Sequence, residues 1–171
     1  MTTVPERVHW TVDLLDLRPT DDVLEIGCGA GHAVALVCQR LERGTITAID
    51  RSSIMVRRAR ERNRGCIEAG RARVEQQALM DASFERQFRK VFAINVNSFW
   101  TTPAPSLTAL KRLLHPQGVA YLTYEPPTTS RLRQLRERLP SLLEENGFDV
   151  RDVREQQFAT PYALCITGTP R

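Results

Sequence analysis

The sequence predicts an α/β protein with a doubly wound, mostly parallel sheet and helices on both faces. Short apolar and β-branched runs alternate with longer stretches in which apolar residues recur every three or four positions, which is typical of strands joined by helical crossovers. The length of 171 residues suits one core, because a chain of about this size buries roughly two-thirds of its unfolded surface. We therefore expect a single domain over residues 1–171.

The elements can be assigned in order from the apolar pattern. A helix is expected over residues 5–17, where Val8, Val12 and Leu15 share one face, and Pro19 ends it. The first strand is expected to run from residue 23 to a glycine turn, and other strands are expected at residues 45–49, 72–77, 88–95, 148–153 and 162–167. Further helices are expected after the glycine turn, after Ser52 or Ser53, and around Leu107, Leu110, Leu113 and Leu114.

The C-terminal portion has a different pattern. Leucines between residues 132 and 143 form a helical stripe that Pro140 should kink or divide before Gly147. The last two strands are joined by a loop that is too short for a crossover helix. They should therefore pair in antiparallel fashion.

Residues 23–31, Val-Leu-Glu-Ile-Gly-Cys-Gly-Ala-Gly, are the most informative stretch of the chain. Gly27, Gly29 and Gly31 lack the Cβ atoms that would hold a ligand away from the backbone, and they permit positive φ angles. A dinucleotide-binding loop would have its third glycine at position 32, where this chain has His32. The turn therefore favours an adenosine-bearing cofactor without phosphates.

An acidic residue follows the next strand. Asp50 ends the run at 45–49, about 20 residues beyond the glycine turn, where a carboxylate can accept both hydroxyls of a ribose. With strand, glycines and acid in register, the chain from about residue 10 to residue 168 resembles the class I S-adenosylmethionine (SAM)-dependent methyltransferases. The resemblance implies a seven-stranded sheet whose last strand is antiparallel, with SAM as the cofactor.

Several positions differ from the pattern of that family. Arg89 stands where the fourth strand usually has an aspartate, and the turn at 113–118 has His115 and Gln117 but keeps its proline and glycine. Ala78 stands where the family commonly has an aspartate that accepts from the adenine amino group. These differences suggest a second hypothesis, a cofactor-binding methyltransferase homologue without catalysis.

The resemblance and the positions at the strand ends together give a set of candidate cofactor residues. Either Asp81 or the backbone amides of residues 78–80 should recognise the adenine edge, with Leu79 or Met80 on the ring, although Asp81 would equally suit a helix cap. In the family the acid of the first motif helps to place the methionine end, and Glu25 matches it. The candidates are Glu25, Gly27, Cys28, Gly29, Gly31, Asp50, Arg51, Ala78, Leu79, Asp81 and Asn95.

The acceptor site should include the segment that follows the fourth strand. The acceptor candidates are Trp10, Asn97, Phe99 and Trp100, a mixture of amide and aromatic groups that suits a small organic molecule. Phe99 and Trp100 would equally suit the core. The segment does not read Asn-Pro-Pro-Tyr, the signature of enzymes that methylate exocyclic amines, so that chemistry is disfavoured.

Methyl transfer needs little acid or base catalysis, because holding the acceptor in near-attack geometry supplies much of the rate. Where the acceptor must lose a proton, Tyr124, Glu125 and His9 are the candidate bases. His32, at a helix start beside the glycine turn, suits a packing or cofactor-adjacent role better than that of a base.

Composition narrows the class of partner. The net charge of +4 is carried almost entirely by arginine, but the densest run, at 57–64, lies on one expected helix without interleaved aromatic residues and suits a solvated face. An RNA methyltransferase therefore remains an alternative to an enzyme that acts on a small-molecule acceptor. A homodimer is compatible with the small size.

Neither a metal site nor a membrane segment is expected. Cys28, Cys38, Cys66 and Cys165 show no C-x-x-C spacing and no histidine partner, so we expect reduced, packed thiols, and no set of acidic magnesium ligands is evident. The chain has no signal-peptide core and no apolar run of about 18 residues. A cytoplasmic protein is expected.

Overall fold

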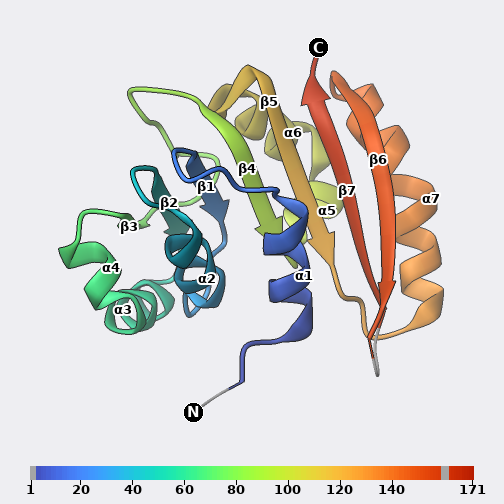
Figure 1. The fold of residues 1–171 in the computed structure, drawn as a ribbon. Helices are drawn as coiled ribbons and strands as arrows, with labels where there is room; N and C mark the ends of the chain where they lie inside the picture. Colours follow the sequence, from blue (N-terminus) through green and yellow to red (C-terminus); the bar gives the residue numbers. More distant parts are fainter. Residues whose placement is uncertain (1–2, 159–161) are drawn as a thin grey trace.

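A computed structural model describes residues 3–158 and 162–171 and contains one seven-stranded sheet flanked by helices (Figure 1). The helices are α1 (Glu6–Leu14), α2 (His32–Arg40), α3 (Ser53–Arg62), α4 (Arg64–Glu68), α5 (Ser98–Thr101), α6 (Pro103–Leu113) and α7 (Thr129–Glu145). The strands are β1 (Asp22–Ile26), β2 (Thr45–Asp50), β3 (Ala72–Gln76), β4 (Phe88–Ile94), β5 (Leu114–Tyr124), β6 (Phe148–Gln157) and β7 (Tyr162–Pro170).

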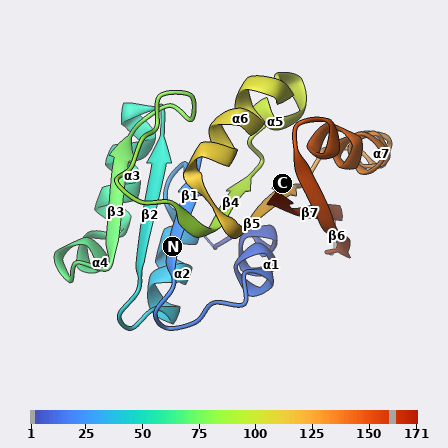
Figure 2. The same ribbon diagram turned by 90° about the horizontal axis from the view of Figure 1, so that it is seen from above.

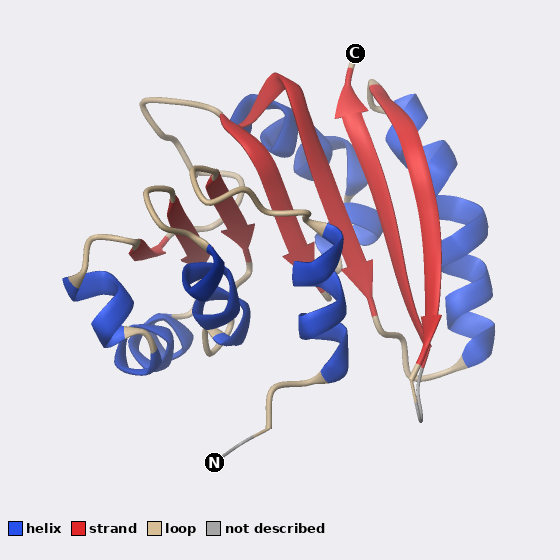
Figure 3. Ribbon diagram, viewed as in Figure 1, coloured by secondary structure: helices blue, strands red, loops and turns tan. Residues whose placement is uncertain are grey.

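The strand order confirms the predicted sheet. The order is β3-β2-β1-β4-β5-β7-β6, in which the first five strands are parallel and β7 pairs antiparallel with both β5 and β6 (Figure 3). After β1 the chain crosses to β2 on one side, and after β4 it crosses to β5 on the other. Neighbouring strands β1 and β4 therefore form the switch point of the sheet, outside whose carboxyl ends ligands bind in open α/β folds.

Two apolar clusters lie on opposite faces of the sheet. One cluster joins α1, α2 and α3 to strand residues such as Val23 and Ile46, and the other joins α6 and α7 to strand residues such as Leu24 and Val91 (Figure 2). Adjacent strand residues belong to different clusters because successive side chains point to opposite faces. The expectation of helices on both faces is confirmed by this division.

Helical cover is incomplete over β2 and β3. On the face of α6 and α7, these strands present Thr45, Thr47, Arg73 and Glu75, which line a recess of about 550 Å³ bounded by the segment 83–88. No helix forms between β3 and β4 in the described chain. These polar side chains tolerate solvent, so the sheet needs no helix there.

Two predicted boundaries differ from the structure. The turn expected at 113–118 lies inside β5 as an irregularity, because the register jumps from Phe88–Leu114 to Lys90–Val119. Pro140 does not divide α7, which continues as one helix across it. The carbonyl group that would have bonded to the missing N–H belongs to exposed Arg136 and can bond to water instead.

The expectation that all four cysteines are reduced is wrong for two of them. Cys38, in the last turn of α2, forms a disulfide with Cys66 of α4, with a Cα–Cα distance of 6.5 Å. Cys28 and Cys165 are free and buried. The sequence spacing gave no sign of the disulfide because its cysteines are 28 residues apart and meet only through the packing of α4 beside α2.

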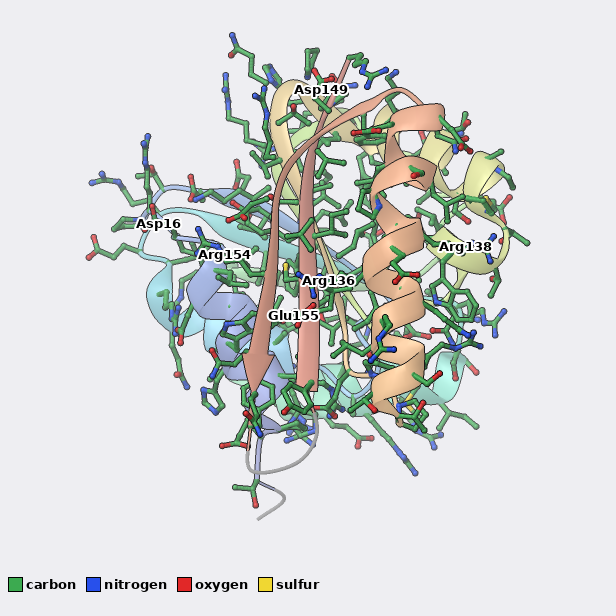
Figure 4. The ribbon with its side chains drawn as sticks, turned by 90° about the vertical axis from the view of Figure 1, so that its right-hand side faces the viewer. Asp16, Arg136, Arg138, Asp149, Arg154 and Glu155 are labelled. Carbon is green, nitrogen blue, oxygen red and sulfur yellow. A yellow bond between two sulfur atoms is a disulfide. The ribbon has the colours of Figure 1, made fainter. Side chains whose placement is uncertain are left out.

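Strand β6 forms one edge of the sheet and carries charged side chains. Arg136 of α7 points toward Glu155 of β6, with an Nε–Oε1 distance of 3.2 Å (Figure 4). Such charges discourage edge-to-edge pairing with other chains. Within the described residues, no helix combines the length and the apolar character needed to cross a membrane.

Candidate functional site

The glycine turn lies at the carboxyl end of β1, at the switch point of the sheet. The amides of Gly27 and Cys28 both donate to the carbonyl oxygen of Ile49, at 2.8 and 3.0 Å, so the turn is held against the end of β2. Gly27, Gly29 and Gly31 have φ angles of 71°, 52° and 76°. Three left-handed residues in five positions explain the glycine spacing, because other residues adopt this conformation at a cost.

Gly29 and Gly31 have different surroundings. A Cβ atom on Gly29 would have no heavy atom within 4 Å, whereas a Cβ on Gly31 would lie 2.5 Å from Asn63 Nδ2 and 2.8 Å from Ala59 Cβ. Gly29 therefore borders open space that a ligand can use, and Gly31 allows α3 to approach the turn. The side chain of Asn63 donates to the Gly31 carbonyl at 2.9 Å, and Arg62 Nε donates to the Ala30 carbonyl at 2.9 Å.

Asp50 is at the carboxyl end of β2 and is fixed by backbone donors. Its Oδ2 atom accepts from the Gly29 amide at 2.9 Å, and its Oδ1 atom accepts from the Ser52 amide at 2.9 Å. Each carboxylate oxygen has two lone pairs, so both retain one acceptor position. These positions suit the ribose hydroxyls predicted from the sequence.

A cavity of about 610 Å³ lies beside these residues. Its lining includes Ile26, Gly27, Ile49, Asp50, Arg51, Gln77, Ala78, Leu79, Met80, Asn95, Val96, Asn97, Ser98, Thr101 and Thr102. A larger groove of about 910 Å³ runs between α3, α4 and edge strand β3, but no residue of the glycine turn lines it. We assign the cofactor to the smaller cavity because Gly27 and Asp50 face it.

The adenine end of the cavity differs from the expectation for Asp81. Asp81 is exposed and is not among the lining residues, and no helix begins after it, so neither the adenine contact nor the helix cap is supported. Gln77 lines the cavity instead, and its Nε2 atom donates to Glu75 Oε2 at 2.6 Å. Its carbonyl oxygen can accept from an amino group. The sequence pattern did not suggest this role, because Gln77 lies one position before Ala78, where the family commonly has its aspartate.

Asn95 joins the ends of β4 and β5. Its φ angle is 57°, its amide donates to the Thr123 carbonyl at 2.8 Å, and its Oδ1 atom accepts from the Glu125 amide at 2.8 Å. Left-handed residues other than glycine cluster at functional sites. The Nδ2 group of Asn95 is the part of this side chain that can donate to a ligand in the cavity.

Glu25 and Cys28 are buried at the base of the site. Glu25 is 3% exposed, its Oε2 atom has no partner, and burial followed by the charge of Asp50 raises its pKa well above 4.5. Burial, with the nearby carboxylates of Glu25 and Asp50, also raises the pKa of the Cys28 thiol. Cys28 therefore remains a neutral, unreactive side chain.

Two of the three candidate bases make other contacts in the structure. Burial raises the pKa of Tyr124, whose hydroxyl donates to the Val96 carbonyl at 2.9 Å, and Glu125 Oε1 forms an ion pair with Arg7 Nη1 at 2.7 Å. His9 is exposed on α1. The Tyr124 hydroxyl is thus committed to Val96, and one carboxylate oxygen of Glu125 is committed to Arg7.

The four acceptor candidates do not form one surface. Phe99 is fully buried in the core, which excludes direct contact with an acceptor in this conformation. Trp100 faces a recess of about 310 Å³ with Arg131, whose guanidinium carbon lies 4.4 Å from the ring centroid. Trp10 packs edge to face against Phe158 at a centroid distance of 6.2 Å. Asn97 alone among the four lines the cofactor cavity.

No metal site was found: within residues 3–158 and 162–171, no group of three or more His, Cys, Asp or Glu side chains comes together to hold an ion. The site consists of backbone turns, the carboxylate of Asp50, the buried acid Glu25 and amide side chains. The open space at Gly29 and the unpartnered oxygen of Glu25 fit a cofactor with an adenosine part and a charged amino-acid part.

Comparison with known proteins agrees with this geometry. The putative methyltransferase YrhH of Bacillus subtilis is 29% identical over 121 residues, which are 70% of this chain and 66% of YrhH. A trans-aconitate 2-methyltransferase of Rhodopseudomonas palustris is 42% identical over 60 residues, which are 33% of this chain and 23% of that enzyme. The chain thus spans just under two-thirds of the first relative and about a quarter of the second.

Solved structures share the fold. The magnesium protoporphyrin IX methyltransferase of Synechocystis, with bound SAM, has a TM-score of 0.69 and 18% identity, covering 96% of this chain and 76% of that one. The family model for the methyltransferase domain matches residues 23–118, which contain the glycine turn, Asp50 and the end of β4. This chain therefore belongs to the SAM-dependent class I methyltransferase family.

Proposed function

We propose that this protein transfers the methyl group of SAM to a small-molecule acceptor whose attacking atom is already deprotonated, such as a carboxylate. The observation that carries the proposal is the engagement of both candidate bases at the end of β5. Tyr124 donates to the Val96 carbonyl and Glu125 is ion-paired with Arg7. A carboxylate needs no base, because its ordinary pKa of about 4 leaves it ionised at neutral pH.

Catalysis on such an acceptor depends on orientation. Bound SAM would supply a methyl group on a positively charged sulfur. The residues of this chain would hold the reactants: Asp50 and the glycine turn take the adenosine part, and Asn95 and Asn97 lie at the end of β4 beside the cavity. Holding the two reacting atoms in contact can supply much of the rate.

A small molecule is favoured over RNA by the contacts of the arginine-rich segment. Of the five arginines at 57–64, Arg60 Nε donates to the Val74 carbonyl at 2.9 Å and Arg62 Nε donates to the Ala30 carbonyl at 2.9 Å. These two guanidinium groups stabilise the fold and have fewer donors left for phosphates.

The names of two relatives are compatible with a carboxylate acceptor. One is the trans-aconitate 2-methyltransferase described above, and another is a malonyl-[acyl-carrier protein] O-methyltransferase of Priestia megaterium, 27% identical over 96 residues. Both matches cover only part of the chain, so they support the chemical class of acceptor and no particular molecule.

The test is a transfer assay with methyl-labelled SAM. The panel pairs small carboxylic acids with their amides and alcohols and includes total RNA. We expect label in a product from which alkali releases methanol, as a methyl ester requires. Transfer only to amines, alcohols or RNA would refute the carboxylate assignment, and cofactor binding without transfer to any member would favour a non-catalytic homologue.

A further inference from the structure

The recess between α5 and α7 has an unbalanced charge. It has a volume of about 310 Å³ and is lined by Trp100, Arg131, Gln134, Leu135 and Arg138. None of these described residues is acidic. The groove along β3 also contains arginines, but Glu61, Glu68 and Glu75 line it with them. The recess between α5 and α7 therefore presents two cations without a matching anion.

Both arginines lie on one flank of α7. Arg131 and Arg138 are seven residues apart, which is two helical turns and about 10.5 Å along the axis. Figure 4 shows Arg138 on the opposite side of α7 from Arg136, which pairs with Glu155 of β6. No ion pair between described residues includes Arg131 or Arg138. Their charges therefore remain available to a ligand.

The neighbouring helices do not neutralise this charge. α5 and α6 contain no aspartate or glutamate, and the first turn of α7 has no acidic residue. Glu137 is the one acid in α7 as far as Arg138, and it is exposed and does not line the recess. The positive end of the α7 dipole adds to the two guanidinium charges. The recess therefore favours an anion.

Trp100 holds the guanidinium group of Arg131 in place. The guanidinium carbon lies 4.4 Å from the centroid of the indole ring, and Nη1 donates to Gln134 Oε1 at 3.0 Å. A guanidinium group carries several N–H donors in one rigid plane, so its other donors remain free after these contacts. A planar group that is fixed in this way suits bidentate binding of a carboxylate or a phosphate.

Trp100 also connects the recess to the cofactor cavity. Its Nε1 atom donates to Asn97 Oδ1 at 3.3 Å, and Asn97 lines the cofactor cavity together with Ser98 and Thr101 of α5. The short helix α5 thus has the cavity on one side and the recess on the other. A volume of about 310 Å³ is at the lower end for ligand pockets, so the recess suits one end of a molecule whose other end lies in the cavity.

We propose that this recess is an anion subsite for the methyl acceptor. Arg131 and Arg138 bind a second carboxylate or phosphate group, remote from the carboxylate that receives the methyl group. The preferred acceptor is then an acid with two anionic groups, because an acid with only one leaves the two cations without a partner. This inference rests on the proposed function, since it takes the reacting carboxylate to lie beside Asn97.

The test measures binding to the protein loaded with S-adenosylhomocysteine, the demethylated product of SAM. The probes are succinate, glutarate and adipate, each compared by calorimetry with its monoamide, which has the same length and one carboxylate fewer. We expect the best dicarboxylate to bind about tenfold or more tightly than its monoamide, as a charged hydrogen-bonded pair requires. Arg131→Gln should abolish this preference, and Arg138→Gln should reduce it.

Arg133→Gln is the matched control. Arg133 is exposed on the same helix and does not line the recess, so this variant removes an equal charge from α7 without changing the proposed subsite. We expect it to keep the preference of the parent for the dicarboxylate.

The location of binding can be read from fluorescence. The chain has two tryptophans, so Trp10→Phe leaves Trp100 as the single emitter. The dicarboxylate should change its emission, because Arg131 lies over the ring, and adding Arg131→Gln should remove this response.

Four outcomes would overturn the proposal. The first is a failure of all three dicarboxylates to bind. The second is an equal loss of dicarboxylate and monoamide affinity in Arg131→Gln, which would indicate only a structural contact between α5 and α7. The third is an equal loss of preference in Arg133→Gln, which would indicate the general charge of α7. The fourth is an emission change with inorganic phosphate when the parent shows no preference for a dicarboxylate, which would indicate a site for free anions.

These measurements need no methyl transfer. A preference for the dicarboxylate that depends on Arg131, found without transfer to any carboxylic acid, would support the subsite and refute carboxylate methylation. Transfer to carboxylic acids without any such preference would do the reverse.

Discussion

Gly31→Ala should destabilise the fold more than Gly29→Ala, although both glycines have positive φ. In each variant the left-handed backbone costs about 1–2 kcal/mol once a Cβ is present. At Gly31 the new Cβ would also lie 2.5 Å from Asn63 Nδ2, 2.8 Å from Ala59 Cβ and 3.0 Å from Ala59 Cα. One of these neighbours is helix backbone, so α3 must shift, and such overpacking costs about 1–3 kcal/mol more.

The expected totals are therefore about 2–5 kcal/mol for Gly31→Ala and about 1–2 kcal/mol for Gly29→Ala. Urea denaturation followed by circular dichroism measures both, and the difference between the variants isolates the packing cost because the backbone cost is common to them. A small domain has about 5–15 kcal/mol of stability, so both variants should remain folded enough to assay.

Ligand binding should show the opposite order. The Cβ of Gly29→Ala enters open space next to the cavity that we assign to the cofactor, so this variant should lose affinity for S-adenosylhomocysteine while it stays more stable than Gly31→Ala. If the two variants lost equal stability, the close approach of α3 to Gly31 would not be a determinant of the turn. If Gly29→Ala bound the ligand like the parent, the cofactor would not pass over this residue.

Three further perturbations test other parts of the site. Asp50→Ala should lower affinity for S-adenosylhomocysteine by about 1.5–3 kcal/mol in calorimetry through loss of charged hydrogen bonds, and an unchanged Kd would move the ribose site elsewhere. The pKa of Glu25 is raised in the folded state, so its contribution to stability is complete below about pH 4.5 and is lost as pH rises through the folded pKa. In urea denaturation between pH 5 and pH 8, Glu25→Gln should remove this loss of stability. Parallel pH profiles of the parent and the variant would contradict the assignment. Reduction of the Cys38–Cys66 disulfide, which closes a loop with a sequence separation of 28, should cost about 3.5 kcal/mol of stability, and Cys66→Ala should melt at the same temperature with and without reductant.

The parts of the site that could be predicted from the sequence are local in the chain. The glycine spacing at 27–31 encodes three positive φ angles within one turn, and Asp50 directly follows its strand, so strand order alone brings them together. The antiparallel pairing of β7 could likewise be predicted, because a short loop leaves no room for a crossover. In each case the physical cause lies within a few residues of the motif.

Other features depend on packing between distant segments. Asp81 looked like a substitute for the missing aspartate, but the loop after β3 turns it into solvent and leaves Gln77 at the cavity. Phe99 was compatible with either the core or the acceptor site, and only the docking of α5 against α6 and α7 decides for the core. The disulfide between Cys38 and Cys66 likewise depends on packing between distant segments, because neither cysteine belongs to a motif.

The candidate cofactor cavity and the N-terminal helix are placed by different means. The cavity is bordered by turns that follow β1, β2 and β3, whereas α1 is joined to the end of β5 by the ion pair between Arg7 and Glu125, 118 residues apart in the sequence. We expect the amino-acid part of the cofactor to lie on the side of α1, because Glu25 shares the face of β1 on which α1 packs. Binding of a complete cofactor would then stabilise the docked position of α1, because a ligand that contacts only this state shifts the population toward it. 5′-Methylthioadenosine, which lacks the amino-acid part, should leave hydrogen exchange of residues 6–14 unchanged, and S-adenosylhomocysteine should slow it; equal protection by both ligands would show that the adenosine end alone holds α1.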